Sequence, residues 1–367
     1  MKSTTEQIYK NKKVLITGHT GFKGSWLSLW LCQMGSEVVG YALAPDTSPG
    51  HYELLGLDHQ SIIADIRDAD KLHKIIRQEG PEIIFHLAAQ PIVRKSYHNP
   101  TETFSTNVMG TVNLLNACRQ SSSVRAVVVV TSDKCYENQQ RQQSYCETDS
   151  LGGHDPYSAS KGCAEIVTSS YRDSFFPIHK YGRNHTTLIA SARAGNVIGG
   201  GDWAQDRLIP DVVQAVSENR TVFIRNPNAT RPWQHVLDCL SGYLMLGQKL
   251  LEQKTEFAQA WNFGPGENGN LKVEVVLRRL QQHWSNIIYQ FVPEHNFHED
   301  GLLQLDCSKA NKQLGWTTTW DIDKALEMTV EWYRHFYEHQ EVISQKQLMQ
   351  YIQTSKTKRT ELQSVAL

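Results

Sequence analysis

Short apolar runs alternate with segments of helical periodicity through the first two thirds of the chain. Runs rich in valine, isoleucine and alanine predict buried strands. They lie at 14–17, 37–42, 61–64, 83–88, 126–131 and 187–192. Between the first two runs, Trp26, Leu27, Trp30, Leu31 and Met34 recur at helical spacing. Regular alternation of strand and helix predicts an α/β fold, in which a Rossmann-like, doubly wound parallel sheet is covered by helices.

The regular alternation of strand-like and helical segments ends after about Gly195, where glycines cluster and the strand-like runs shorten. Helices are predicted before this point at 68–79, from Pro100 toward Cys118 and at 157–172, and after it at 237–251, 273–284 and 321–339. We therefore predict a first domain over 10–195, with late elements returning to it from about 230–265. A smaller C-terminal α/β domain, mainly 196–340, is expected to bind the substrate and cover it. The polar segment 345–367 is predicted to be a tail that frays.

Charge and cysteine content narrow the possible partners. Lys plus Arg number 37 and Asp plus Glu 38, so no global field indicates nucleic acid or a membrane surface. The seven cysteines are scattered without a CxxC pair, which argues against disulfides and zinc and fits a reducing compartment. The histidines form no HxH or HExxH pattern, so no metal site is expected. The polar N-terminus lacks a secretory apolar core, and we predict a cytoplasmic protein.

A glycine-rich turn follows the first predicted strand and opens the helix that contains Trp26. It reads Gly18-His19-Thr20-Gly21-Phe22-Lys23-Gly24. Glycines let the backbone approach a pyrophosphate, and the helix N-terminus offers N–H groups and a favourable dipole. The turn therefore predicts a dinucleotide site. The second strand ends without the acidic residue that usually holds the ribose 2′-hydroxyl, which leaves NAD and NADP open.

A second cluster of polar residues has the composition of a proton-transfer site. Tyr157 and Lys161 lie one helical turn apart, so both face the same side. A neighbouring ammonium helps a phenol to act as a base near neutral pH. Ser132, Asp133 and Lys134 follow the apolar run 126–131 and so lie at the end of a predicted strand.

These motifs together resemble the extended short-chain dehydrogenases over roughly 14–266, and within them the nucleotide-sugar 4,6-dehydratases. In that family a Ser or Thr is followed by Asp-Glu, whereas Lys134 stands here in place of Glu. The Asp-Lys variant, with TGHTGFKG, RAGNVIGGGDW and RPWQHV, is similar to the CDP-glucose group of the family. The resemblance implies bound NAD, CDP-glucose as the substrate, and a homodimer or homotetramer.

The resemblance also implies a reaction. Tyr157 would remove the proton from O4 of the hexose as hydride leaves C4, with Ser132 hydrogen-bonded to O4. Asp133 would protonate the departing C6 hydroxyl. Lys134 is then either a base of lowered pKa for the C5 proton or an ammonium that stabilises the enolate while water is the base.

Binding roles follow from the same resemblance. Cofactor contacts are implied for Gly18, Thr20, Gly21, Phe22, Lys23, Gly24, Asp65, Ile66, Leu87, Ala88, Ala89, Tyr157 and Lys161. Asp65 and Ile66 would lie at the adenine and the 87–89 segment at the nicotinamide. Substrate contacts are implied for Arg94, Asn196, Arg231 and His235, with Arg231 suited to a phosphate.

Other functions fit the same scaffold. A nucleotide-sugar 4-epimerase or reductase, or a dehydratase acting on another nucleotide hexose, would use the same glycine turn and the Tyr157–Lys161 pair. A regulator that only senses NAD(P) needs neither Tyr157 nor Lys161. Asp133 and Lys134 favour the dehydratase.

Overall fold

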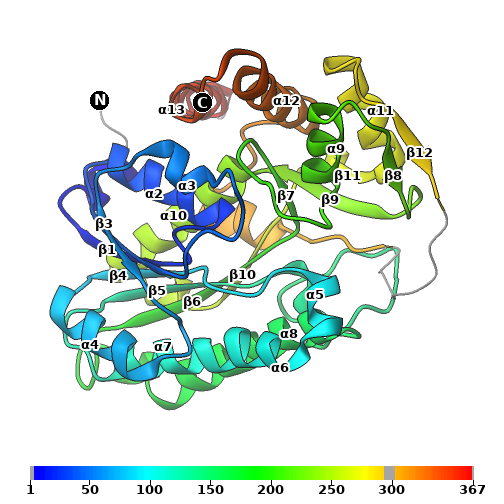
Figure 1. Cartoon of the computed structure of the whole chain (residues 1–367). Helices are drawn as coiled ribbons and strands as arrows, with labels where there is room; N and C mark the ends of the chain where they lie inside the picture. The colour runs from blue at the N-terminus through cyan, green and yellow to red at the C-terminus, as the bar shows by residue number, and fades with distance from the viewer. Residues whose placement is uncertain (1–3, 293–301, 366–367) are drawn as a thin grey trace.

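A computed structural model of the protein describes residues 4–292 and 302–365. Its centre is a seven-stranded sheet in the order β3-β2-β1-β4-β5-β6-β10 (Figure 1). All neighbouring strands in it run parallel. The strands are β1 (Lys13–Thr17), β2 (Glu37–Ala42), β3 (Gln60–Ile63), β4 (Ile83–His86), β5 (Ala126–Val130), β6 (Leu188–Ala194) and β10 (Ala260–Phe263). The predicted Rossmann-like α/β fold is thus confirmed, and the strand order changes direction between β1 and β4.

The central strands are buried on both faces, which explains their continuous apolar sequences. In β5, Val128 and Val130 join one apolar cluster, and Val127 and Val129 join the cluster on the opposite face. Successive side chains of a strand point to opposite sides, so every residue of such a strand must be apolar.

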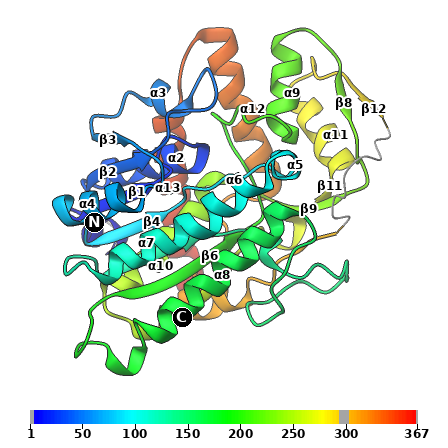
Figure 2. The same ribbon diagram turned by 60° about the horizontal axis from the view of Figure 1, so that its bottom comes forward.

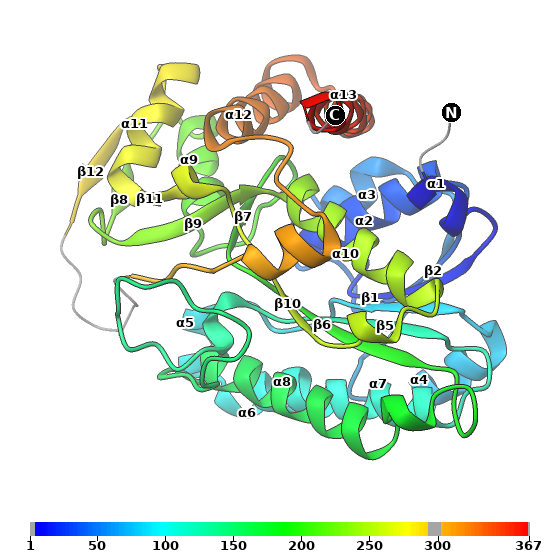
Figure 3. The ribbon, with the colours of Figure 1, turned by 180° about the vertical axis from the view of Figure 1, so that it is seen from behind.

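Helices cover both faces of the sheet (Figures 1 and 3). On one face lie α1 (Thr4–Tyr9), α2 (Phe22–Gln33), α3 (His51–Leu55) and α10 (Val236–Leu251). On the other lie α4 (Ala69–Glu79), α5 (Val93–His98), α6 (Pro100–Phe104), the π-helix η1 (Ser105–Met109), α7 (Gly110–Arg119) and α8 (Pro156–Ser174). Asp155 caps α8 by accepting from the N–H of Ser158, with Pro156 in the first turn. This cap fixes the helix start that presents Tyr157.

A smaller lobe lies beside the carboxyl ends of the main strands (Figure 1). It contains a three-stranded sheet of β7 (Asn196–Ile198), β9 (Thr230–His235) and β11 (Asn270–Lys272), and a pair, β8 (Val222–Ile224) and β12 (Tyr289–Phe291). Its helices are α9 (Leu208–Ser217), α11 (Val273–His283) and α12 (Ile322–His339). Short helices lie in the segments that connect these elements: η2 (Asp133–Cys135), η3 (Ile178–Lys180), η4 (Thr255–Phe257), η5 (Glu267–Gly269) and η6 (Ala310–Leu314). The domain boundaries given above remain a prediction.

The C-terminal segment differs from its prediction. Instead of fraying, it forms the helix α13 (Ser344–Val365), which packs against α2. Leu348 and Tyr351 are buried, and the Tyr351 hydroxyl donates to Asp238 Oδ1 at 2.7 Å. The prediction was wrong because a few apolar residues at helical spacing anchor a segment whose overall composition is polar. Within the described residues, no helix is long and apolar enough to cross a membrane.

Truncation of Leu348 tests whether α13 stabilises the fold. Leu348→Ala should lower the free energy of unfolding by about 2–5 kcal/mol, since it leaves a cavity at a buried site. Gln350→Ala is the matched control, because Gln350 is exposed on the same helix and should change the free energy by less than about 0.5 kcal/mol. Urea unfolding measures both. Equal values for the two variants would show that α13 does not stabilise the fold.

Asp238 should make stability depend on pH. Burial raises the pKa of this carboxyl to about 7, whereas the pKa of an Asp in an unfolded chain is about 3.9. Between these values the folded chain binds a proton that the unfolded chain lacks, so the free energy of unfolding falls as pH rises from about 4 to 7. Asp238→Asn should remove this part of the dependence. Urea titrations at several pH values measure it, and unchanged slopes would contradict the assignment.

Candidate functional site

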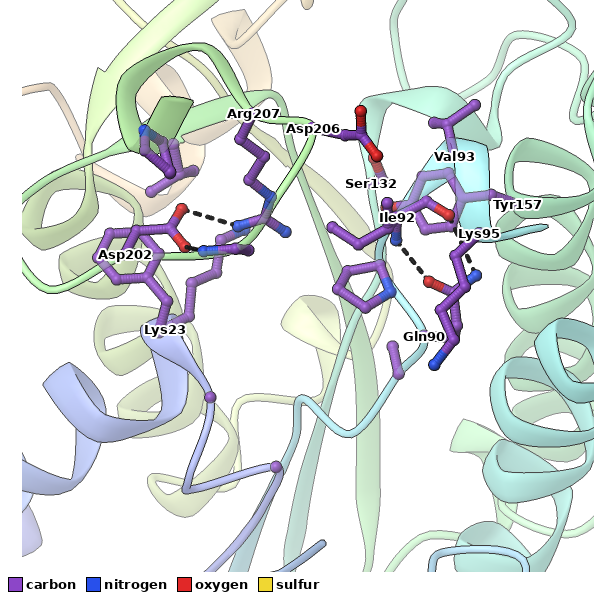
Figure 4. Close-up of a pocket in the computed structure, with 18 of the residues that line it drawn as sticks. Lys23, Gln90, Ile92, Val93, Lys95, Ser132, Tyr157, Asp202, Asp206 and Arg207 are labelled. Carbon is purple, nitrogen blue, oxygen red and sulfur yellow. Dashed lines mark hydrogen bonds and ion pairs between the residues drawn. The ribbon is translucent and has the colours of Figure 1, made fainter. Parts of the chain in front are cut away.

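A cavity of about 600 Å³ lies at the carboxyl ends of the main strands and extends under the smaller lobe. In doubly wound folds, ligands bind outside the carboxyl ends of the strands where the strand order changes direction. The volume suits a small-molecule ligand. Figure 4 shows side chains from both lobes facing each other across it.

The glycine turn forms one wall of the cavity. Gly18 has a φ of 78°, and a Cβ there would lie 2.7 Å from the backbone N of Ala88. A Cβ at Gly24 would lie 2.0 Å from the Gly18 carbonyl oxygen. No side chain caps the start of α2, so this end can bind an anion through its N–H groups. The turn therefore fits the pyrophosphate of a dinucleotide.

The other predicted cofactor residues also line this cavity: Thr20, Gly21, Phe22, Lys23, Asp65, Ile66, Leu87, Ala88 and Ala89. The Asp65 carboxylate accepts hydrogen bonds from Arg67, which lower its pKa. β2 ends at Ala42, which lines the cavity as well. An apolar side chain thus occupies the strand end that usually presents an acid to the ribose.

Ser132 and Asp133 form a hydrogen-bonded pair at the end of β5. The Ser132 hydroxyl donates to Asp133 Oδ1 at 2.8 Å. Asp133 is only 3 % exposed, and its Oδ2 atom has no hydrogen-bond partner among the described residues. Burial raises the pKa of this carboxyl, although Lys134, Ser132 and Arg231 oppose the shift. A buried carboxyl of raised pKa is suited to donate a proton.

Tyr157 and Lys161 line the same part of the cavity. Burial raises the pKa of Tyr157 to about 12, while a hydrogen bond with Ser132 and the charge of Arg207 lower it. Burial, followed by repulsion from Lys23, lowers the pKa of Lys161 to about 8. In this state the phenol keeps its proton at neutral pH. Its use as a base requires more positive charge nearby.

A buried ion pair supports this cluster from behind. Arg193 Nη2 lies 2.9 Å from Glu165 Oε2, and both side chains are almost fully buried. Glu165 also accepts hydrogen bonds from the hydroxyls of Thr131 and Ser191. Glu165 belongs to α8, Thr131 directly follows β5, and Ser191 and Arg193 belong to β6. The pair therefore fixes α8 relative to the strand end that presents Ser132 and Asp133.

Three of the predicted substrate residues line the cavity, namely Arg94, Asn196 and Arg231, as does Lys134. His235 does not. Its ring is fully buried beside Trp26 and Trp320, and Nδ1 accepts from the N–H of Leu237 at the start of α10. The structure therefore places His235 as a helix cap and not among the residues that face a substrate.

Charged residues missed by the sequence analysis also face the cavity (Figure 4). Arg207 Nη1 lies 2.9 Å from Asp202 Oδ2. Asp206 Oδ1 lies 3.2 Å from Arg225 Nη1 and 3.5 Å from Arg94 Nη1. Asp202, Asp206 and Arg207 lie in the loop between β7 and α9, whereas Arg225 follows β8 and Arg94 belongs to α5. Only the fold brings these three segments together. The described residues contain no group of histidines, cysteines or carboxylates that could hold a metal ion.

Comparison with known proteins gives consistent matches over nearly the whole chain. The sequence model of the GDP-mannose 4,6-dehydratase family matches residues 15–329. The CDP-glucose 4,6-dehydratase of Salmonella typhimurium is 47 % identical over 352 residues, covering 95 % of this chain and 98 % of that protein.

A solved structure shares the fold at lower identity. The dTDP-glucose 4,6-dehydratase DesIV from Streptomyces venezuelae, solved with NAD bound, is 25 % identical with a TM-score of 0.75. The match covers 88 % of this chain and 97 % of DesIV. The UDP-glucose 4-epimerase of Mycoplasma pneumoniae is also similar, at 24 % identity over 89 % of this chain and 97 % of its own.

Proposed function

The chain belongs to the GDP-mannose 4,6-dehydratase family, and from this premise we propose that it is a hydro-lyase that converts CDP-glucose to CDP-4-keto-6-deoxyglucose. The observation that carries the proposal is the buried Ser132–Asp133 pair beside Tyr157, with an unpartnered carboxyl oxygen at the cavity. The 47 % identity to the Salmonella enzyme supports CDP-glucose as the substrate.

We propose NAD as the cofactor, held by the glycine turn and by the 65–66 and 87–89 segments. The NAD-bound DesIV structure supports this choice over NADP. Bound NAD would supply the hydride chemistry, with hydride leaving C4 of the glucose and returning to C6, so that no cofactor would be consumed. Tyr157 accepts the O4 proton during the first transfer, and Ser132 orients O4 by a hydrogen bond.

Asp133 serves the elimination of water. Oxidation at C4 acidifies the hydrogen at C5, and the C6 hydroxyl must gain a proton to leave. Asp133 supplies this proton, because its raised pKa keeps it protonated at higher pH than an exposed carboxyl. Lys134 lines the cavity directly after Asp133, and we assign its ammonium to stabilising the enolate that forms when water takes the C5 proton. A proton returns to C5 when hydride is delivered to C6.

An epimerase uses the same scaffold but needs no acid for a leaving group. The carboxyl of Asp133 at the cavity therefore favours the dehydratase over the epimerase.

Substrates with other nucleotides share this chemistry. The protein can be incubated with CDP-, dTDP-, UDP- and GDP-glucose, and mass spectrometry would identify the one that loses water. Water loss that is fastest from a nucleotide sugar other than CDP-glucose would contradict the proposal.

Asp133→Asn should separate oxidation from elimination. Dehydrated product should form about 10²–10⁴ times more slowly, because the leaving hydroxyl lacks its acid. Deprotonation at C5 should continue, so substrate recovered from deuterated water should carry deuterium at C5. Mass spectrometry measures both quantities.

Tyr157→Phe is the matched control, because it blocks the preceding oxidation. It should stop product formation and deuterium uptake together. If Asp133→Asn forms product at the normal rate, the role assigned to Asp133 is wrong. If Tyr157→Phe does so, the entire reaction scheme is wrong.

We also propose a homodimer or homotetramer formed through α6, η1 and α8, which lie side by side (Figure 2). Apolar side chains stay exposed there: Phe104 (38 %), Met109 (50 %), Ile166 (56 %) and Phe175 (41 %). Such a surface is typical of an interface.

Light scattering should give at least a dimer, and Ile166→Asp should shift the protein toward the monomer. Ile288→Asp, at an exposed residue of the other lobe, should not. A monomeric wild-type protein would refute the proposal.

A further inference from the structure

One end of the cavity is not used by the reaction described above. The glycine turn and the 65–66 segment form the cofactor end, and Ser132, Asp133 and Tyr157 mark the reacting sugar. Arg231 lies close enough to Asp133 to affect its pKa, so the phosphates next to the sugar belong at the start of β9. Beyond Arg231 the cavity is lined by β8, the turn that follows it, and the first turn of α9.

The side chains at this end provide an aromatic ring and charges of both signs. Phe223 on β8 lines the cavity and is 62 % exposed. Arg225 follows on the same segment, and its guanidinium pairs with Asp206. Asp211, in the first turn of α9, lines the cavity as well and accepts a hydrogen bond from the backbone of Asp206. A flat ring with polar edges fits such a set, because bases stack on aromatic side chains and are read at their edges.

The two acidic residues differ in their surroundings. Asp206 Oδ1 is engaged by both Arg225 and Arg94. Burial and the negative charge of Asp206 raise the pKa of Asp211 to about 6, although the charges of Arg225 and Arg220 oppose the shift. Above this pH Asp211 is a carboxylate that gains from an additional hydrogen-bond donor.

The bases of nucleotide sugars differ at the position that such a carboxylate would meet. Cytosine presents an amino group, a hydrogen-bond donor, where uracil and thymine present the O4 acceptor. A carboxylate attracts the amino group and repels the carbonyl oxygen, so it favours one base and disfavours the others.

We propose that Asp211 selects cytosine, its carboxylate accepting a hydrogen bond from the amino group of the base while Phe223 packs on the ring. This inference rests on the proposed function and adds the residue that determines which nucleotide is accepted. In this proposal Asp211 contacts the base and not the reacting sugar. Its substitution should therefore change KM more than kcat.

Asp211→Asn is the decisive variant, since an amide of the same shape can donate to O4 of uracil. At pH 8 it should lower kcat/KM for CDP-glucose by about 10- to 100-fold, mostly through KM. The preference for CDP-glucose over UDP-glucose should fall at least about tenfold. Calorimetry with CDP and UDP, which are not turned over, should show that the ratio of CDP affinity to UDP affinity falls by a similar factor. An unchanged NAD affinity would establish that the variant is folded.

Asp206→Asn is the matched control at the same end of the cavity. Because its carboxylate already pairs with arginines, this variant should weaken CDP and UDP to a similar extent. An unchanged CDP-to-UDP affinity ratio in Asp211→Asn, or a changed ratio in Asp206→Asn alone, overturns the proposal. If wild-type protein binds CDP tightly but dehydrates no CDP-glucose, the proposed function fails while the affinity ratios still test Asp211.

Discussion

The buried ion pair of Glu165 and Arg193 is the interaction on which the arrangement of the site depends. It links α8, the helix that carries Tyr157 and Lys161, to β6, and through Thr131 to the end of β5. Arg193 also donates to the Tyr136 hydroxyl at 2.7 Å, beyond the η2 turn that contains Asp133. Removing two charges from water is costly, and hydrogen bonds to both partners offset part of that cost. Each bond of this network therefore holds one element of the site in place.

The fold could be predicted because its requirements are local. A parallel strand covered on both faces must be apolar throughout, and Ala126–Val130 meets this condition without ambiguity. The Asn99-Pro100 helix start and the glycine turn are likewise set by neighbouring residues. The C-terminal helix was missed because its stability comes from Leu348 and Tyr351 packing against distant elements. Composition of the segment alone does not contain that information.

The same distinction applies to the site. Tyr157 and Lys161 share a helix, and Ser132, Asp133 and Lys134 are consecutive, so their proximity follows from sequence. Arg207 reaches Tyr157 only because the smaller lobe folds over the cavity. His235 illustrates the opposite case: it lies in the pattern RPWQHV, which predicts phosphate binding, yet the fold turns its ring inward, where it caps α10. Which side of β9 a residue faces depends on pairing with β7 and β11.

The charges around the cavity connect cofactor binding to the reactivity of the tyrosine. Repulsion from Lys23 is part of what lowers the pKa of Lys161 to about 8. Lys23 lies in the glycine turn, where the cofactor's pyrophosphate is placed by the proposed function. Negative phosphates there would offset the charge of Lys23, so the pKa of Lys161 would rise and its ammonium would persist to higher pH. The phenol has a pKa of about 12 in the protein alone, and an ammonium that persists one helical turn away is the kind of charge that its use as a base would require.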